Sequence, residues 1–153
     1  MYMSRTRILP LSAASLALSA LLFAAAPALG QEAKSIGNFE AWAAYTAGTG
    51  RQMTCYMVAQ PEKAELADRR DDIYVLVYHR PEEKDENVVQ IDAGYSYKQG
   101  SEAVLTIDGK SWKLFTKEGT AWTVSPEDDK AIVAAMRKGT RMTVKGTSSR
   151  DNS

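Results

Sequence analysis

Short apolar runs separated by turn residues dominate the chain after residue 31. The clearest run is 72–80, DIYVLVYHR, which is almost entirely β-branched and aromatic and is therefore typical of a β-strand. The whole pattern predicts about five to seven short strands. The runs that carry this prediction are 38–46, 52–59, 72–80, 87–97, 103–116, 120–124 and 141–147.

Two pieces of local punctuation refine this pattern. Asp108-Gly109 lies between two apolar-alternating runs, which is a strong short-range signal for a β-hairpin. The segment SPEDDKAIVAAMRKG has instead the signals of a helix near 126–138. Ser125 is placed to cap its N-terminus, Pro126 stands at the first helical position, and Gly139 is expected to end it in a left-handed conformation.

Short strands with a single connecting helix argue for a mainly β domain. We expect an antiparallel β-sandwich, immunoglobulin-like in architecture, with one short helix near 126–138.

The first thirty residues have the layout of a secretory signal peptide. Arg5 and Arg7 form a basic start, an apolar stretch follows, and Ala28 and Gly30 supply small residues before a cleavage site after Gly30. The apolar stretch is shorter than the roughly 20 residues of a membrane span and is bracketed by prolines. We therefore expect residues 1–30 to be a Sec-type signal peptide, and 31–153 to be a single domain in the periplasm or at the cell surface, with no transmembrane segment after cleavage.

The charge of the mature chain is nearly balanced. Loss of Arg5 and Arg7 would leave 17 of the 19 basic residues against 19 acidic ones. A domain without a basic surplus lacks the electrostatic footprint of a nucleic-acid binder, so we expect no nucleic-acid partner.

The residue inventory excludes several kinds of site. Cys55 is the sole cysteine and His79 the sole histidine, so a zinc site built from several such ligands within one chain is excluded. A thiol nucleophile with a histidine base is chemically allowed, but Cys55 lacks the flanking residues of thiol-protease signatures. We therefore expect no enzyme activity and no cofactor.

Aromatic residues offer a second kind of chemistry. Trp42, Trp112, Trp122 and Tyr95 are candidate ligand or interface residues, because such side chains stack on saccharides. The alternative is that they pack in the core of a small β domain and along its edges.

Several phrases in fixed order together resemble the invasion-associated locus B family of exported alphaproteobacterial proteins. The resemblance covers Ser35 to Arg150, and the phrases are SIGNFEAWAAYT, CYMVAQPEKAE, RRDDIYVLVYHRP, AGYSYKQGSEAVLTIDGKSWKLFT, TAWTVSPEDDKAIVAAMRKG and MTVKGTSSR. It implies a periplasmic or surface β-sandwich that contributes to host-cell invasion or colonisation, or to envelope function, through contacts with a protein or an envelope component. The rival function is a periplasmic saccharide-binding module. The family has no established catalytic site, so no residue roles are carried over.

The resemblance also bears on Cys55. Family members continue beyond the SSR region through a further strand to a helical tail with a second cysteine, whereas this sequence ends TSSRDNS. This implies a C-terminally shortened domain in which Cys55 is half of a disulfide whose other half is absent. Two alternatives stay open for Cys55: it links two copies into a homodimer, or it is a buried reduced thiol.

Overall fold

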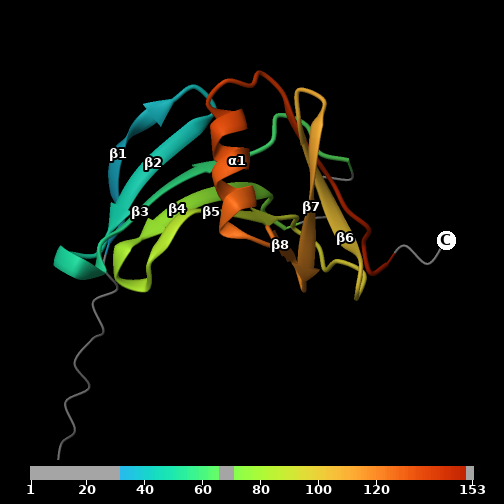
Figure 1. Cartoon of the computed structure of the whole chain (residues 1–153), viewed down its shortest axis with the longest axis horizontal. Coiled ribbons are helices and arrows are strands. Elements are labelled where there is room, and N and C mark those ends of the chain that lie inside the picture. Colours follow the sequence, from blue (N-terminus) through green and yellow to red (C-terminus); the bar gives the residue numbers. More distant parts are fainter. Residues whose placement is uncertain (1–31, 66–70, 151–153) are drawn as a thin grey trace, which may run out of the picture.

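The computed structural model describes residues 32–65 and 71–150 of the chain (Figure 1). The signal peptide expected at 1–30 lies outside the described residues. Within them, nine strands, one α-helix and two short 3-10 turns follow in order. They are β1 (Lys34–Phe39), β2 (Trp42–Ala47), η1 (Gly50–Gln52), β3 (Thr54–Ala59), β4 (Tyr74–Arg80), η3 (Pro81–Glu83), β5 (Asp85–Asp92), β6 (Glu102–Ile107), β7 (Lys110–Lys117), β8 (Thr120–Trp122), α1 (Pro126–Met136) and β9 (Met142–Lys145).

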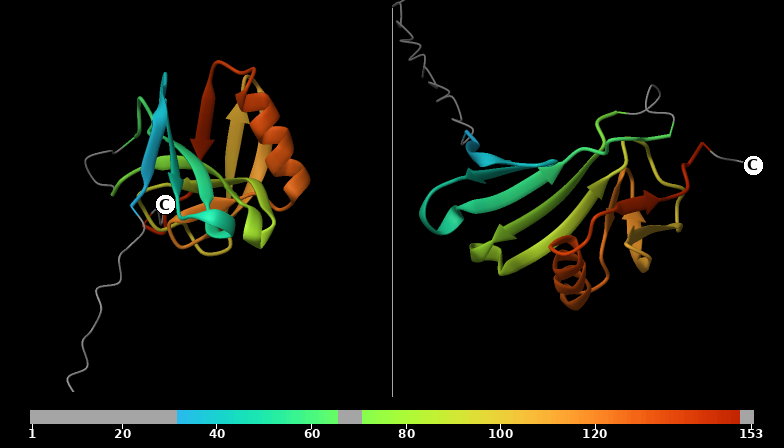
Figure 2. Two further views of the ribbon diagram at one scale, coloured as in Figure 1. Left: turned by 90° about the vertical axis from the view of Figure 1, so that its left-hand side faces the viewer. Right: turned by 90° about the horizontal axis from the view of Figure 1, so that it is seen from above.

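All nine strands belong to one antiparallel sheet in the order β1-β2-β3-β4-β5-β8-β7-β6-β9. The sheet is strongly curled, with β1–β3 on one side of the molecule and β6 and β7 on the other (Figure 1 and Figure 2). The short strand β8 pairs with β5 along one edge and with β7 along the other, and so joins the two halves. The expectation of a mainly β, antiparallel fold with one helix is confirmed. Its two facing halves resemble the layers of a sandwich but are continuous through β8.

The core lies inside this curl, on what we call the inner face of the sheet. Val77 and Val89 are paired in register on β4 and β5, and Ala103 and Leu114 are paired on β6 and β7. All four belong to one buried cluster, which also contains Ile132 of the helix. Burial of a Val or Leu side chain contributes about 1.5–3 kcal/mol each, so this shared cluster fixes the curvature.

Helix α1 begins as the sequence predicts. The hydroxyl of Ser125 accepts a hydrogen bond from the backbone N–H of Asp128 at 3.2 Å and donates one to the carboxylate of Asp128 at 3.0 Å. Pro126 occupies the first turn. Because the cap satisfies a backbone donor that the helix itself leaves free, it fixes the point at which the chain turns from β8 into the helix.

The end of α1 differs from the prediction. The helix ends at Met136 instead of 138, and Gly139 is not in the left-handed conformation expected of it. A Cβ at residue 139 would stand 2.6 Å from Cγ2 of Ile107 and 2.9 Å from the carbonyl oxygen of Ala135. Glycine is therefore required at 139 by the close approach of the chain to β6, which no local sequence signal reports.

The predicted hairpin is confirmed. Strands β6 and β7 pair from Ile107 opposite Lys110, and Asp108 and Gly109 both have positive φ angles, of 44° and 89°. This is the backbone geometry that a two-residue hairpin with right-handed strand twist requires. The carboxylate of Asp108 also accepts hydrogen bonds from the backbone N–H groups of Thr140 and Arg141, at 2.9 and 3.0 Å, which ties the turn to the segment before β9.

Candidate interaction surface

The outer face of the sheet, opposite the core, carries apolar side chains on several neighbouring strands. On β2, β3 and β4, every second residue points outward, and the registers place these residues in rows that cross the strands. One row contains three tyrosines and the next contains aliphatic residues. We call the first the tyrosine row: Tyr45, Tyr56 and Tyr78.

The tyrosine row is pre-packed. Tyr45 is paired in register with Tyr56 on β3, which is paired with Tyr78 on β4. The rings of Tyr45 and Tyr56 stack with centroids 5.3 Å apart and planes at 21°. The guanidinium of Arg80 lies 4.9 Å from the ring centroid of Tyr78. All three tyrosines are half-buried, so they are held in place while their outer edges stay accessible.

Burial raises the pKa of Tyr78, while the neighbouring guanidinium of Arg80 acts in the opposite direction. The Tyr78 hydroxyl therefore keeps its proton at neutral pH and can both donate and accept a hydrogen bond. The row thus presents hydroxyl groups on a fixed apolar base.

The neighbouring row continues across the sheet. It pairs Val58 with Leu76, Leu76 with Gln90, Gln90 with Trp122, and Trp122 with Phe115. Apart from Gln90, these outward side chains are apolar. The outer face therefore carries apolar residues from β3 to β7.

At the β7 end of this row the surface deepens into what we call the Trp122 groove, of about 410 Å³. The rings of Phe115 and Trp122 stack with centroids 5.5 Å apart and planes at 25°. Phe115 is 46% exposed and Val124 is 71% exposed. The groove is lined by Val88, Phe115, Lys117, Trp122, Thr123, Val124, Ser125, Pro126 and Asp129.

The aromatic residues singled out from the sequence are divided between the two faces. Trp112 is buried in the core, and Trp42 and Tyr95 pack against it. Trp122 alone of the four lies on the outer face, in the groove. Sequence reasoning missed the tyrosine row and Phe115. Only the pairing register shows that they share a face, and a single strand does not reveal that register.

Cys55 and His79 are directly opposite one another on β3 and β4. Nδ1 of His79 accepts a hydrogen bond from the backbone N–H of Asn87 at 3.1 Å. In neutral His79 the proton is therefore on Nε2, which can donate but not accept. Cys55 is half-buried and unpaired, on the same side of β3 as Met57 and Ala59. The two residues are neighbours, but the imidazole is not arranged as a base for the thiol.

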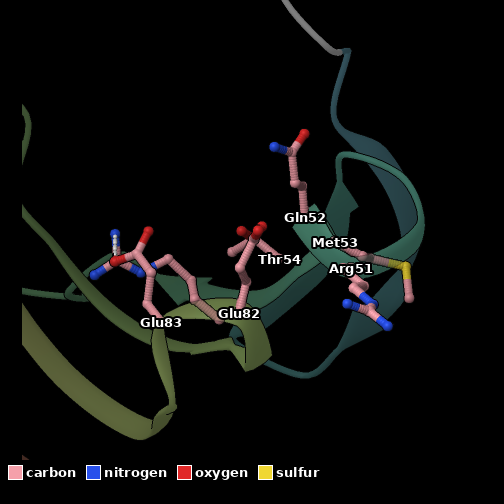
Figure 3. A pocket seen from close by; sticks show the side chains of 7 residues that line it. Arg51, Gln52, Met53, Thr54, Glu82 and Glu83 are labelled. Carbon is pink, nitrogen blue, oxygen red and sulfur yellow. Dashed lines mark ion pairs between the residues drawn. The ribbon is translucent and has the colours of Figure 1, made fainter.

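A second, polar pocket of about 210 Å³ lies between η1 and η3 (Figure 3). Arg80 is already engaged there, with Glu83 at 3.0 Å and with Asp85. Figure 3 shows Arg51 pointing away from the carboxylates of Glu82 and Glu83. Because its basic and acidic side chains either form ion pairs or point apart, this pocket does not gather charges of one sign that would attract a charged ligand.

Within residues 32–65 and 71–150, no group of three or more His, Cys, Asp or Glu side chains is placed to hold a metal ion. Over the same residues, no helix has the length and hydropathy that crossing a bilayer requires.

Comparison with known proteins gives one match. No curated protein and no solved structure is significantly similar to the chain. The family model described as "Invasion associated locus B (IalB) protein" matches residues 42–153, a range that runs from the first residue of β2 beyond β9 and includes the tyrosine row and the Trp122 groove. The chain therefore belongs to the invasion-associated locus B family.

Proposed function

We propose that this chain is a non-enzymatic exported protein of the bacterial envelope or surface. It contributes to host-cell invasion or colonisation, or to envelope function, through contacts with another protein. The tyrosine row is the contact surface. Family membership supports the invasion-associated class, and the layout of residues 1–30 supports export.

The observation that carries the proposal is the pre-packed row of Tyr45, Tyr56 and Tyr78, which lies beside the outward apolar residues Val58 and Leu76. Tyrosine is enriched at protein interfaces because its ring contributes apolar area and its hydroxyl a hydrogen bond. These rings already stack on one another or on Arg80, so a partner need not order them. That lowers the entropic cost of binding.

The same geometry argues against a saccharide-binding module. A sugar stacks on the open face of an aromatic ring, but Tyr45 and Tyr56 each turn one face to the other, and Trp122 turns one to Phe115. Trp42 and Trp112 are directed to the core instead. Fewer ring faces are thus open to a sugar, whereas a polypeptide can also hydrogen-bond to the tyrosine hydroxyls.

The proposal assigns no catalytic role to Cys55. Nδ1 of the neighbouring His79 already accepts a hydrogen bond from the backbone N–H of Asn87. This hydrogen bond would have to break before His79 could accept the thiol proton.

The test is complementation of a strain that lacks the gene. The double variant Tyr45→Ser/Tyr56→Ser removes the stacked pair of the row. We expect it to be exported and folded but to fail to restore cell attachment, entry or envelope integrity. Tyr56→Phe keeps the ring and should lose only the part of the complementation that depends on the Tyr56 hydroxyl.

The matched control is Thr106→Ala/Ser111→Ala. These two residues lie on the outer face of β6 and β7, with their hydroxyls hydrogen-bonded at 2.8 Å, and several strands separate them from the tyrosine row. It should behave as the wild type. Full complementation by the folded double tyrosine variant would overturn the proposal.

A further inference from the structure

The Trp122 groove is a shallow, open depression with apolar lining, and an exposed apolar side chain stands beside it. Val88, Phe115 and Trp122 line the groove, and Val124, at its rim, projects with 71% of its surface exposed. An aliphatic side chain exposed to this degree beside an apolar hollow is costly to leave in water. The molecule therefore offers both halves of a complementary contact on one patch.

The charges around the groove are opposite at its two ends. Lys117, opposite Thr120 in the β7–β8 register, marks one end. The other end is the start of α1, where exposed Glu127 follows Pro126. Among the described residues, neither Lys117 nor Glu127 has an ion-pair partner. The surface around the groove is thus basic at one end and acidic at the other, and the exposed apolar residues Phe115 and Val124 lie between.

We propose that this groove is the interface for a second copy of the chain, related by a two-fold axis that passes near the Phe115–Trp122 pair. A two-fold contact places the same patch on both sides, so the patch must complement itself. The two-fold rotation turns the groove of the second copy end for end. Lys117 of each copy then lies opposite Glu127 of the other, and Val124 of each copy packs into the groove of the other. A partner with a uniformly charged binding segment would meet a repulsive end instead.

The dimer rests on the same outer face as the proposed function but on different residues. Val88 of the groove is paired in register with Tyr78, so the dimer would border the tyrosine row on each copy. Tyr45 and Tyr56 lie further away, on β2 and β3. Failure of the dimer would leave the contact function of the row intact, and the reverse also holds.

The experiment is sedimentation velocity of the purified full chain over a range of concentrations, with reductant present so that no species linked through Cys55 contributes. We expect a reversible monomer–dimer equilibrium. Val124→Asp, at an exposed position, should weaken the dimer by at least about tenfold in Kd, because it places a charge in the partner's apolar hollow.

The matched control is Ile36→Asp. Ile36 is 58% exposed on β1, at the far edge of the sheet from β8, so this variant introduces the same charge at a similarly exposed apolar site. It should dimerise as the wild type does. Dissociation by Ile36→Asp but not by Val124→Asp would move the interface to β1 and overturn the assignment.

A charge exchange tests the axis itself. Lys117→Glu and Glu127→Lys should each weaken the dimer by about tenfold, since symmetry creates two repulsive pairs from one substitution. The double variant should regain most of the wild-type affinity. A wild-type protein that stays monomeric to about 1 mM, or a double variant no tighter than the singles, would refute the proposal.

Discussion

Replacing Asp129 tests how the helix is joined to the sheet. Strand β8 ends at Trp122, so the next backbone donor of β5 in that direction, the N–H of Val89, has no strand beside it. The carboxylate of Asp129 accepts that hydrogen bond at 2.9 Å, across forty residues of sequence. Val89 is fully buried and Asp129 is only 6% exposed. One side chain on α1 thus completes the hydrogen bonding of β5.

The magnitude follows from what each substitution leaves behind. Asp129→Ala leaves the buried N–H of Val89 without a hydrogen-bond acceptor, at a cost of about 1–3 kcal/mol. Alanine returns up to about 0.7 kcal/mol through its higher helix propensity. We therefore expect a loss of about 1–2 kcal/mol in the free energy of unfolding. Asp129→Asn keeps an oxygen acceptor at the same place, so the expected loss is within about 0.5 kcal/mol.

Both variants also remove the dependence on pH that the Asp129 carboxyl gives the wild type. Burial raises the pKa of Asp129, although the hydrogen bonds from the Val89 N–H and the Thr123 hydroxyl act in the opposite direction. A carboxyl with a raised pKa in the folded state favours folding while it is protonated. This contribution is full below the unfolded-state pKa and is lost as pH rises through the folded-state value. Relative to wild type, Asp129→Asn should therefore gain stability as the solution is made less acidic.

Urea unfolding, followed by tryptophan fluorescence at several pH values, measures both effects. The matched control is Glu127→Gln, compared at a protein concentration at which the chain is monomeric. It removes an exposed carboxylate from the same helical turn, where no sheet hydrogen bond depends on it. The control should cost no more than the helix-dipole contribution of about 0.3–1 kcal/mol. Equal stability of the alanine and asparagine variants at every pH would refute the reasoning, because it would mean that the acceptor at Val89 contributes nothing.

Three further predictions concern other parts of the fold. Gly139→Ala should lower the free energy of unfolding by about 1–3 kcal/mol in the same assay, because the new Cβ meets Ile107; an unchanged value would contradict the close packing. Hydrogen bonds from the backbone N–H groups of Thr140 and Arg141 lower the pKa of Asp108. The contribution of this carboxylate to folding stability is therefore present above the unfolded-state pKa and is lost as pH falls through the folded-state pKa. Asp108→Asn should therefore flatten the acid side of a plot of Tm against pH, and an unaltered slope would contradict this. The intact mass of protein treated with a thiol-alkylating reagent, without reductant, should correspond to residues 31–153 with one alkyl group on Cys55. Alkylation should be slow because the thiol is half-buried, and a disulfide-linked dimer would contradict this prediction.

The features that sequence predicted well are those with local causes. The Asp108-Gly109 hairpin and the Ser125 cap follow from residues adjacent in the chain, and both are confirmed. The role of Gly139 could not be predicted, because its cause is the approach of Ile107 from another strand. The link from Asp129 to Val89 was hidden for the same reason. An acidic residue in the first turn of a helix has a sufficient local explanation, the helix dipole, which conceals its second contact.

The candidate surface was hidden by a different ambiguity. The runs TCYMVA and YVLVYHR are apolar at inward and outward positions alike, a pattern typical of strands covered on both faces. The structure buries the inward side on β4, whereas inward Met57 of β3 is 37% exposed. The inward residues Val75 and Val77 join the core, while the outward tyrosines of β3 and β4 remain half-exposed. The pairing register is what separates the two faces. It brings the tyrosines of β3 and β4 together on the outer side, which is the surface on which we propose the protein contact.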